Sequence, residues 1–140
     1  MQVIRIEHPS TGIGPYRHNR DCVPELMYGC DPDRHPTITT DMDGNELARI
    51  DGTFTAAHHR FGFLNKDQAL RWFNEHERKA VTERGFVARV YDVPDAIVGR
   101  SQVVFDLRVA KLVGHIDPER FVSGDLNMLI AADQEHGADS

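Results

Sequence analysis

The chain has 140 residues, of which 40% are hydrophobic and 27% charged, with a formal net charge of -6 at pH 7. This length is typical of one folded domain, and the acidic balance argues against a protein that binds nucleic acid through a clustered basic face. With no apolar run near the roughly 20 residues that span a bilayer, no signal-peptide pattern and only two cysteines, we expect a cytoplasmic protein with reduced thiols.

The chain opens with alternating apolar and polar side chains at residues 2–7, the period of a half-buried strand. Five of the seven prolines then fall between Pro9 and Pro36. Proline interrupts helices and central strands, so we predict a long N-terminal loop here. Long loops without regular structure are usually functional.

Two Asp-Gly pairs follow, at residues 43–44 and 51–52. Asp-Gly between β-forming residues favours tight hairpin turns. The sequence therefore predicts short antiparallel strands near residues 37–41, 46–50 and 53–57.

The clearest element begins after Asn65, whose side chain can cap a helix while Gln68 reaches back three residues later. Apolar residues then recur on one face and charged residues on the other. Gly85 is suited to end the helix in the left-handed conformation. We predict one main helix over about residues 66–84.

After Gly85, the segments FVARVYDVP, SQVVFD and KLVGHI predict three closing strands. The segment DLNMLIAA predicts a short helix, and the acidic end of the chain is expected to fray. The whole pattern predicts an α+β fold with a mostly antiparallel sheet. We place a single domain at residues 1–122, and the short helix and acidic tail at 123–140.

This order of elements resembles the ADP-ribosyltransferase-like fold. In that family an arginine or histidine ends the first strand and holds NAD, an aromatic strand leads into a helix, and a glutamate opens a late strand. The resemblance implies that the first strand and the strand led by Gln102 lie side by side. It implies a catalytic position at Gln102, with His8, and cofactor-binding residues at Arg5, His8, Phe61, Phe63 and Asn65.

Gln102 stands where the family has its glutamate. Breaking the nicotinamide bond builds positive charge on the ribose, which a carboxylate stabilises and a neutral amide does not. Gln102 therefore favours a protein that binds NAD, a related nucleotide or a host protein without strong catalysis. Structural alternatives are a polar residue at a strand start for Gln102, a hydrogen bond to the loop for His8, and an ion pair with Glu7 for Arg5.

The chain also resembles small proteins of phage and prophage genomes over about residues 1–117. The resemblance depends on the opening HPSTGIGPY and on the segment from GF to RWF. We predict a phage-type accessory protein that binds a host protein or nucleotide, with the loop from Pro9 to Pro36 as its recognition surface. One alternative is an active NAD-dependent ADP-ribosyltransferase that modifies a host target.

A second alternative is a small structural zinc protein. Two mixed pairs of cysteine and histidine fit the ligands of tetrahedral zinc. Their spacings are four and five residues, neither pair has the C-x-x-C form, and seven residues link the cysteines. Ordinary loop residues are therefore favoured over a zinc site. The candidate ligands are His18, Cys22, Cys30 and His35.

Overall fold

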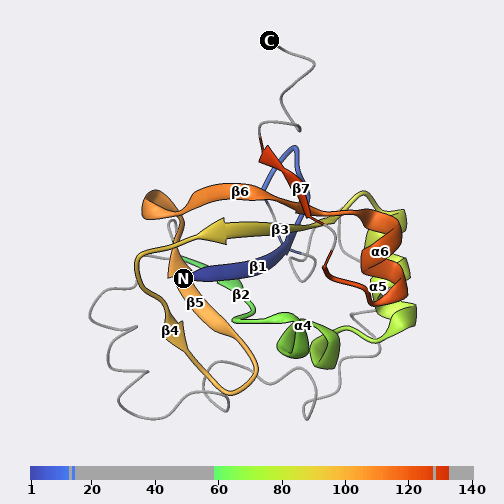
Figure 1. Ribbon diagram of the computed structural model, residues 1–140, viewed down its shortest axis with the longest axis horizontal. Coiled ribbons are helices and arrows are strands. Elements are labelled where there is room, and N and C mark those ends of the chain that lie inside the picture. The colour runs from blue at the N-terminus through green and yellow to red at the C-terminus, as the bar shows by residue number, and fades with distance from the viewer. Residues whose placement is uncertain (13, 15–58, 128, 133–140) are drawn as a thin grey trace.

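The computed structural model describes residues 1–12, 14, 59–127 and 129–132, which form two antiparallel sheets and several short helices (Figure 1). The predicted α+β class with a mostly antiparallel arrangement is confirmed. The strands expected between residues 37 and 57 lie outside the described residues. Within the described part of the chain, no helix has the length and apolar character that crossing a membrane requires.

The larger sheet, here called sheet A, contains four strands in the order β1-β3-β6-β7, and every neighbouring pair is antiparallel. The first three are the strands that the sequence predicts, and their β-branched and aromatic residues account for them. The strands are β1 (Gln2–Glu7), β3 (Val87–Asp92), β6 (Lys111–Ile116) and β7 (Leu129–Ala131).

The smaller sheet, sheet B, has the order β2-β5-β4. It is joined to sheet A where Ile4 and Phe63 exchange backbone hydrogen bonds of 2.8 and 2.7 Å. A β-carbon on Gly62 would lie 2.7 Å from the carbonyl oxygen of Ile4, so this junction requires glycine. The strands are β2 (His59–Gly62), β5 (Val103–Asp106) and β4 (Ile97–Val98).

The predicted main helix is two helices, α4 (Lys66–Trp72) and α5 (Glu75–Glu83). Phe73 between them is extended and only 1% exposed, and its ring packs edge-on against Phe63. Asn74 then starts α5 with a reciprocal capping box. The prediction of one continuous helix is wrong because burying Phe73 turns the chain and the cap at Asn74 restarts it.

The end of the described chain also differs from the sequence-based prediction. Residues Leu129–Ala131 form β7 against β6, where a helix was predicted. A helix that we did not predict, α6 (Pro118–Ser123), precedes them, with an Asp117 cap and a left-handed Gly124 at its end. Because β7 pairs with β6, sheet A includes residues 129–131.

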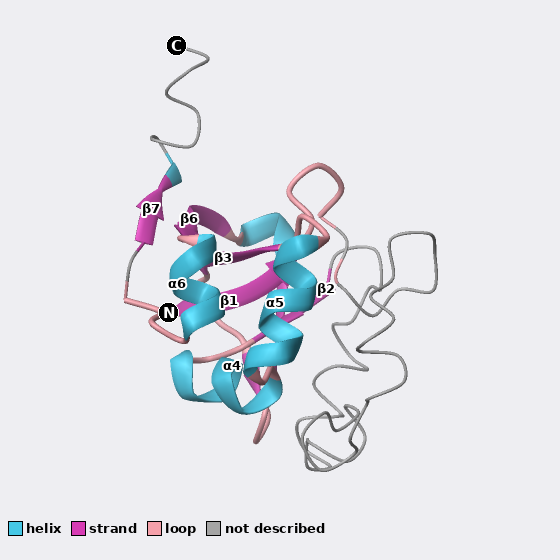
Figure 2. Cartoon of the chain, turned by 90° about the vertical axis from the view of Figure 1, so that its right-hand side faces the viewer, coloured by secondary structure: helices cyan, strands magenta, loops and turns pink. Residues whose placement is uncertain are grey.

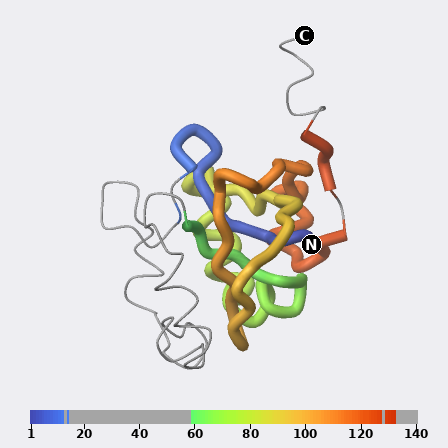
Figure 3. The backbone as a smooth tube through the Cα atoms, turned by 90° about the vertical axis from the view of Figure 1, so that its left-hand side faces the viewer, coloured from blue at the N-terminus to red at the C-terminus, as the bar shows by residue number. Residues whose placement is uncertain are grey.

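The three α-helices cover one face of sheet A (Figure 2). The alternation along β1 places Ile4 and Ile6 on this face, in a core with Trp72, Phe73 and residues of β3 and β6. The other face carries Val3 and packs partly against sheet B. Strand β1 therefore lies inside the fold, as its course in blue shows in Figure 3.

Candidate functional site

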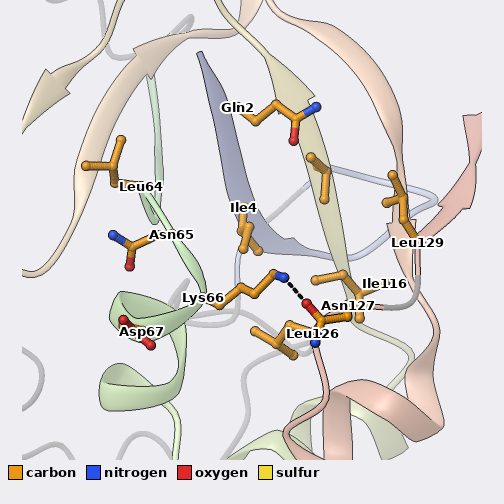
Figure 4. A pocket seen from close by; sticks show the side chains of 11 residues that line it. Gln2, Ile4, Leu64, Asn65, Lys66, Asp67, Ile116, Leu126, Asn127 and Leu129 are labelled. Carbon is orange, nitrogen blue, oxygen red and sulfur yellow. Dashed lines mark hydrogen bonds between the residues drawn. The ribbon is translucent and has the colours of Figure 1, made fainter.

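A cleft of about 530 Å³ lies on the helix-covered face of sheet A, between the start of α4 and the segment that joins α6 to β7 (Figure 4). Its floor is the sheet itself, because Ile4, Val90 and Ile116 line it from three neighbouring strands. Leu129 of β7 continues the lining at the sheet edge. The full lining is Gln2, Ile4, Leu64, Asn65, Lys66, Asp67, Val90, Ile116, Leu126, Asn127 and Leu129.

The rim of this cleft is polar. Lys66 from α4 reaches across and donates a hydrogen bond from Nζ to the side-chain oxygen of Asn127, as the dashed line in Figure 4 shows. Among the described residues no carboxylate forms an ion pair with Lys66. The amides of Gln2 and Asn65 complete the rim beside the exposed carboxylate of Asp67. The cleft thus presents one ammonium group, one carboxylate and three amides over an apolar floor.

Strand β7 adds a second binding feature. It is the last strand of sheet A, and among the described strands none pairs with its outer edge. An open edge exposes backbone donors and acceptors that another extended chain can use. Leu129 belongs both to this strand and to the cleft lining, so the edge and the cleft adjoin.

The predicted cofactor ligand Arg5 has a structural role. Its Nε donates to Glu7 at 3.0 Å, its Nη1 to the carbonyl of Phe61 at 2.9 Å and its Nη2 to the carbonyl of Gly12 at 3.0 Å. Burial lowers the pKa of Arg5, and the charge of Glu7 opposes that shift. The ion pair with Glu7 and the two backbone contacts tie β1 to β2 and to the following turn.

His8 also makes local contacts. It follows β1, and its Nδ1 lies 2.7 Å from the hydroxyl of Ser10. Its carbonyl accepts hydrogen bonds from the amides of Thr11 and Gly12 at 3.2 and 2.7 Å, which closes a turn. The ring packs edge-on against Phe86. These contacts hold the first turn after β1.

Gln102 and His8 lie in different parts of the fold. It is 7% exposed and its carbonyl accepts from the amide of Gly99 at 2.8 Å, which closes the turn between β4 and β5. The next residue, Val103, pairs with Gly62 of β2, so β2 separates β1 from the strand led by Gln102. The expectation that these two strands lie side by side is wrong. Gln102 is level with Phe63 and Ile4, and His8 is four residues beyond Ile4, about 13 Å along the strand.

The three remaining predicted cofactor residues are dispersed. Phe63 is a core residue between Trp72 and Phe73, and Phe61 is 38% exposed on β2. Asn65 caps α4 by accepting from the amide of Gln68, as predicted, and also lines the cleft. Of the residues that the resemblance selected, Asn65 is the one in the cleft lining.

The candidate zinc ligands His18, Cys22, Cys30 and His35 lie outside the described residues, as does most of the predicted recognition loop. In the part of the chain that the structure describes, no group of three or more histidine, cysteine or acidic side chains could hold a metal ion.

Sequence reasoning missed Lys66, Asn127 and Leu129. The sequence predicts Lys66 to be a charged residue in the first turn of a helix. It predicts Leu129 to belong to the apolar face of a short helix. They come together only because β7 returns to the edge of sheet A. No local signal marks that return except Gly114 in β6, which allows β7 to approach closely.

These features describe a small α+β protein with a cleft beside an open sheet edge. The chain belongs to the Bacteriophage T4 Y00F protein family, whose model matches residues 1–119. The predicted phage-type character is confirmed at the level of this family. The resemblance to ADP-ribosyltransferases is not supported, and no solved structure matches the chain.

The chain is also similar to a protein of Enterobacteria phage T4 described as "Uncharacterized 19.7 kDa protein in motB-dexA intergenic region". The two are 39% identical over 69 residues. That alignment covers 48% of this chain and 41% of the relative, so the chain matches about two fifths of the relative's length.

Proposed function

We propose that this protein is a phage accessory protein that acts by binding a host protein, without catalysis of its own. The cleft and the edge of β7 together receive an extended segment of the partner. The observation that carries the proposal is the contiguity of an apolar cleft with an open strand edge through Leu129.

Strand addition accounts for both features. An extended segment beside β7 forms backbone hydrogen bonds with the sheet edge and directs alternate side chains to the cleft face. An apolar side chain at such a position packs on Leu129, at the end of the cleft that adjoins the sheet edge. The amides of the rim suit the peptide groups on either side of it, because they both donate and accept hydrogen bonds.

Lys66 indicates the chemistry next to that apolar residue. Its ammonium group bonds to the neutral amide of Asn127, and a carboxylate is a stronger acceptor for it. The partner segment therefore carries an acidic residue next to its apolar anchor. On this proposal Lys66 changes partners when the segment binds.

The chemistry of the cleft supports a peptide over a nucleotide. Lys66 is the one cation among the described lining residues, it lies beside Asp67, and none of these lining residues is aromatic. A dinucleotide needs compensation for two phosphate charges and usually a surface on which its bases stack. An apolar floor with amide groups at its rim satisfies neither need.

Site-specific photo-crosslinking tests the proposal. A benzophenone amino acid is placed at Asn127, in the cleft, or at Glu119, an exposed control position on α6, and each protein is irradiated in host cells. We expect one discrete host-protein adduct from position 127 and none from position 119. Lys66→Glu should remove that adduct, whereas Lys79→Glu, which reverses an exposed charge on α5, should leave it.

Two results would contradict the proposal. One is the absence of any adduct from the cleft position. The other is an adduct that forms equally from both positions and does not respond to Lys66→Glu. Because both lysines are exposed, neither reversal should impair folding.

A further inference from the structure

The face of sheet A opposite the cleft carries a row of basic side chains. Arg5 on β1 is directly opposite Arg89 on β3, and Arg89 is directly opposite His115 on β6. Directly opposed residues share a face and hold their β-carbons about 5 Å apart. The like charges of Arg5 and Arg89 repel in such positions, so this pair favours a compensating anion.

Glu7 compensates only part of this charge. It is 1% exposed and accepts from Nε of Arg5 at 3.0 Å and from the hydroxyl of Tyr91. The oxygen that accepts from Tyr91, Oε1, also lies 3.6 Å from Nη1 of Arg89, which is within ion-pair range but too long for a hydrogen bond. Among the described residues of this row, two guanidinium groups thus face one carboxylate, which leaves one positive charge without a partner carboxylate.

The hydrogen-bond donor that remains available in this row belongs to Arg89. All three donor nitrogens of Arg5 named above have acceptors. The Nε–H of Arg89, in contrast, is buried and has no hydrogen-bond partner among the described residues. A buried donor without an acceptor is unfavourable and indicates a group that binds there. The Nε atom itself is buried, whereas the side chain of Arg89 as a whole is 18% exposed, so a ligand reaches Nε from solvent when the guanidinium turns outward.

We propose that Arg89, with His115 beside it, binds a phosphate group. A phosphate oxygen supplies the acceptor that Nε of Arg89 lacks, and the planar guanidinium suits two oxygens of one phosphate. A third phosphate oxygen can face the imidazole of His115 on the neighbouring strand. The ligand's negative charge compensates the surplus of the row. This site is independent of the proposed host-protein cleft, since it lies on the other face of the sheet.

The test uses the unmodified protein and the side-chain Nε–H signals of arginine in a nitrogen-proton correlation spectrum. Inorganic phosphate is titrated against sodium chloride at equal ionic strength. We expect the Arg89 signal, assigned by its loss in Arg89→Lys, to move downfield and to saturate with phosphate and not with chloride. The Arg5 signal is the internal control and should stay in place, because its Nε–H already donates to Glu7.

A second titration with adenosine monophosphate separates free phosphate from a phosphate ester. If the Arg89 signal saturates at a lower concentration of adenosine monophosphate than of inorganic phosphate, the result supports the site and assigns it to a phosphate ester. Saturation by inorganic phosphate at the lower concentration supports the site and assigns it to the free ion. An Arg89 signal that does not move in either titration, or that moves equally in chloride, overturns the proposal.

Discussion

Gly114 in β6 lies so close to β7 that a β-carbon built on it would be 2.1 Å from the carbonyl oxygen of Ile130. No ordinary β-carbon contact is that short, so only glycine permits β7 to pair here. Since β7 carries Leu129, this one residue also determines whether the cleft has its wall at the sheet edge.

We predict that Gly114→Ala displaces β7 and costs about 1–3 kcal/mol of local stability, the usual cost of overpacking. Hydrogen exchange should show faster exchange of the β7 amides while those of β3 stay protected. Val113→Ala, which adds no atom to the same strand, should leave β7 protected. Unchanged exchange in β7 of the Gly114→Ala protein would show that the strand accommodates the methyl group.

The break between α4 and α5 depends on the cap at Asn74. Its side chain accepts from the amide of Glu77 at 2.8 Å, and Glu77 accepts from the amide of Asn74 at 3.0 Å. We predict that Asn74→Ala lowers the free energy of unfolding by about 0.5–2 kcal/mol. Urea unfolding measures the change, and Glu75→Ala, an exposed change in the same turn, should cost less. Equal losses would contradict the role of the cap.

The hydrogen bond from Tyr91 to the buried carboxylate of Glu7 predicts a mutational effect at neutral pH. Tyr91→Phe removes a donor and leaves the carboxylate with one fewer partner. We predict a loss of about 1.5–3 kcal/mol at pH 7, the range for hydrogen bonds to charged groups. Chemical unfolding of both proteins measures the difference. A loss within error of zero would show that the carboxylate finds another donor.

Burial, with the hydrogen bond to Glu7, raises the pKa of Tyr91 from 10.0 to about 12. Between those values the unfolded chain loses the phenolic proton and the folded protein keeps it, so the contribution of Tyr91 to stability decreases as pH rises. We therefore predict that the advantage of the wild type over Tyr91→Phe narrows between pH 10 and pH 12. A difference that stays constant over this range would contradict the raised pKa.

We predict that NAD does not stabilise this protein, because the residues that the resemblance selected are dispersed through the fold. A ligand at 100 times its dissociation constant adds about 2.7 kcal/mol to stability, which a melting curve detects readily. The midpoint should be the same with and without excess NAD, and in the His8→Ala protein as well. A melting midpoint that rises with NAD in the wild type and not in His8→Ala would contradict this prediction and support a nucleotide site at His8.

The strands were predictable from the sequence where the pattern is local. Residues 2–7 alternate in polarity and form β1. The segments that form β3, β5 and β6 are rich in β-branched and aromatic residues, which favour strands. The start of a second helix at Asn74 was also predictable, because Asn74 and Glu77 have the spacing of a capping box. Our prediction followed the apolar stripe instead and passed over the cap.

The segment around Leu129 shows where local patterns are insufficient. Its composition favours a helix, but pairing with the exposed edge of β6 stabilises a strand. Tertiary contacts of this kind override intrinsic preference. The cleft depends on the same event, since Lys66 and Asn127 are separated by 61 positions in the sequence and meet only in the folded sheet. The contacts of Arg5 were equally hidden, because its guanidinium donates to Glu7 and to two carbonyls that only the fold brings beside it.

The internal position of β1 has a consequence for synthesis. This strand leaves the ribosome well before its partners Phe63 and β3 are made. Until then the partners of β1 among the described residues are missing, and this part of the fold cannot form. Folding should therefore begin only after β3 has emerged, which makes assembly a late and largely concerted step.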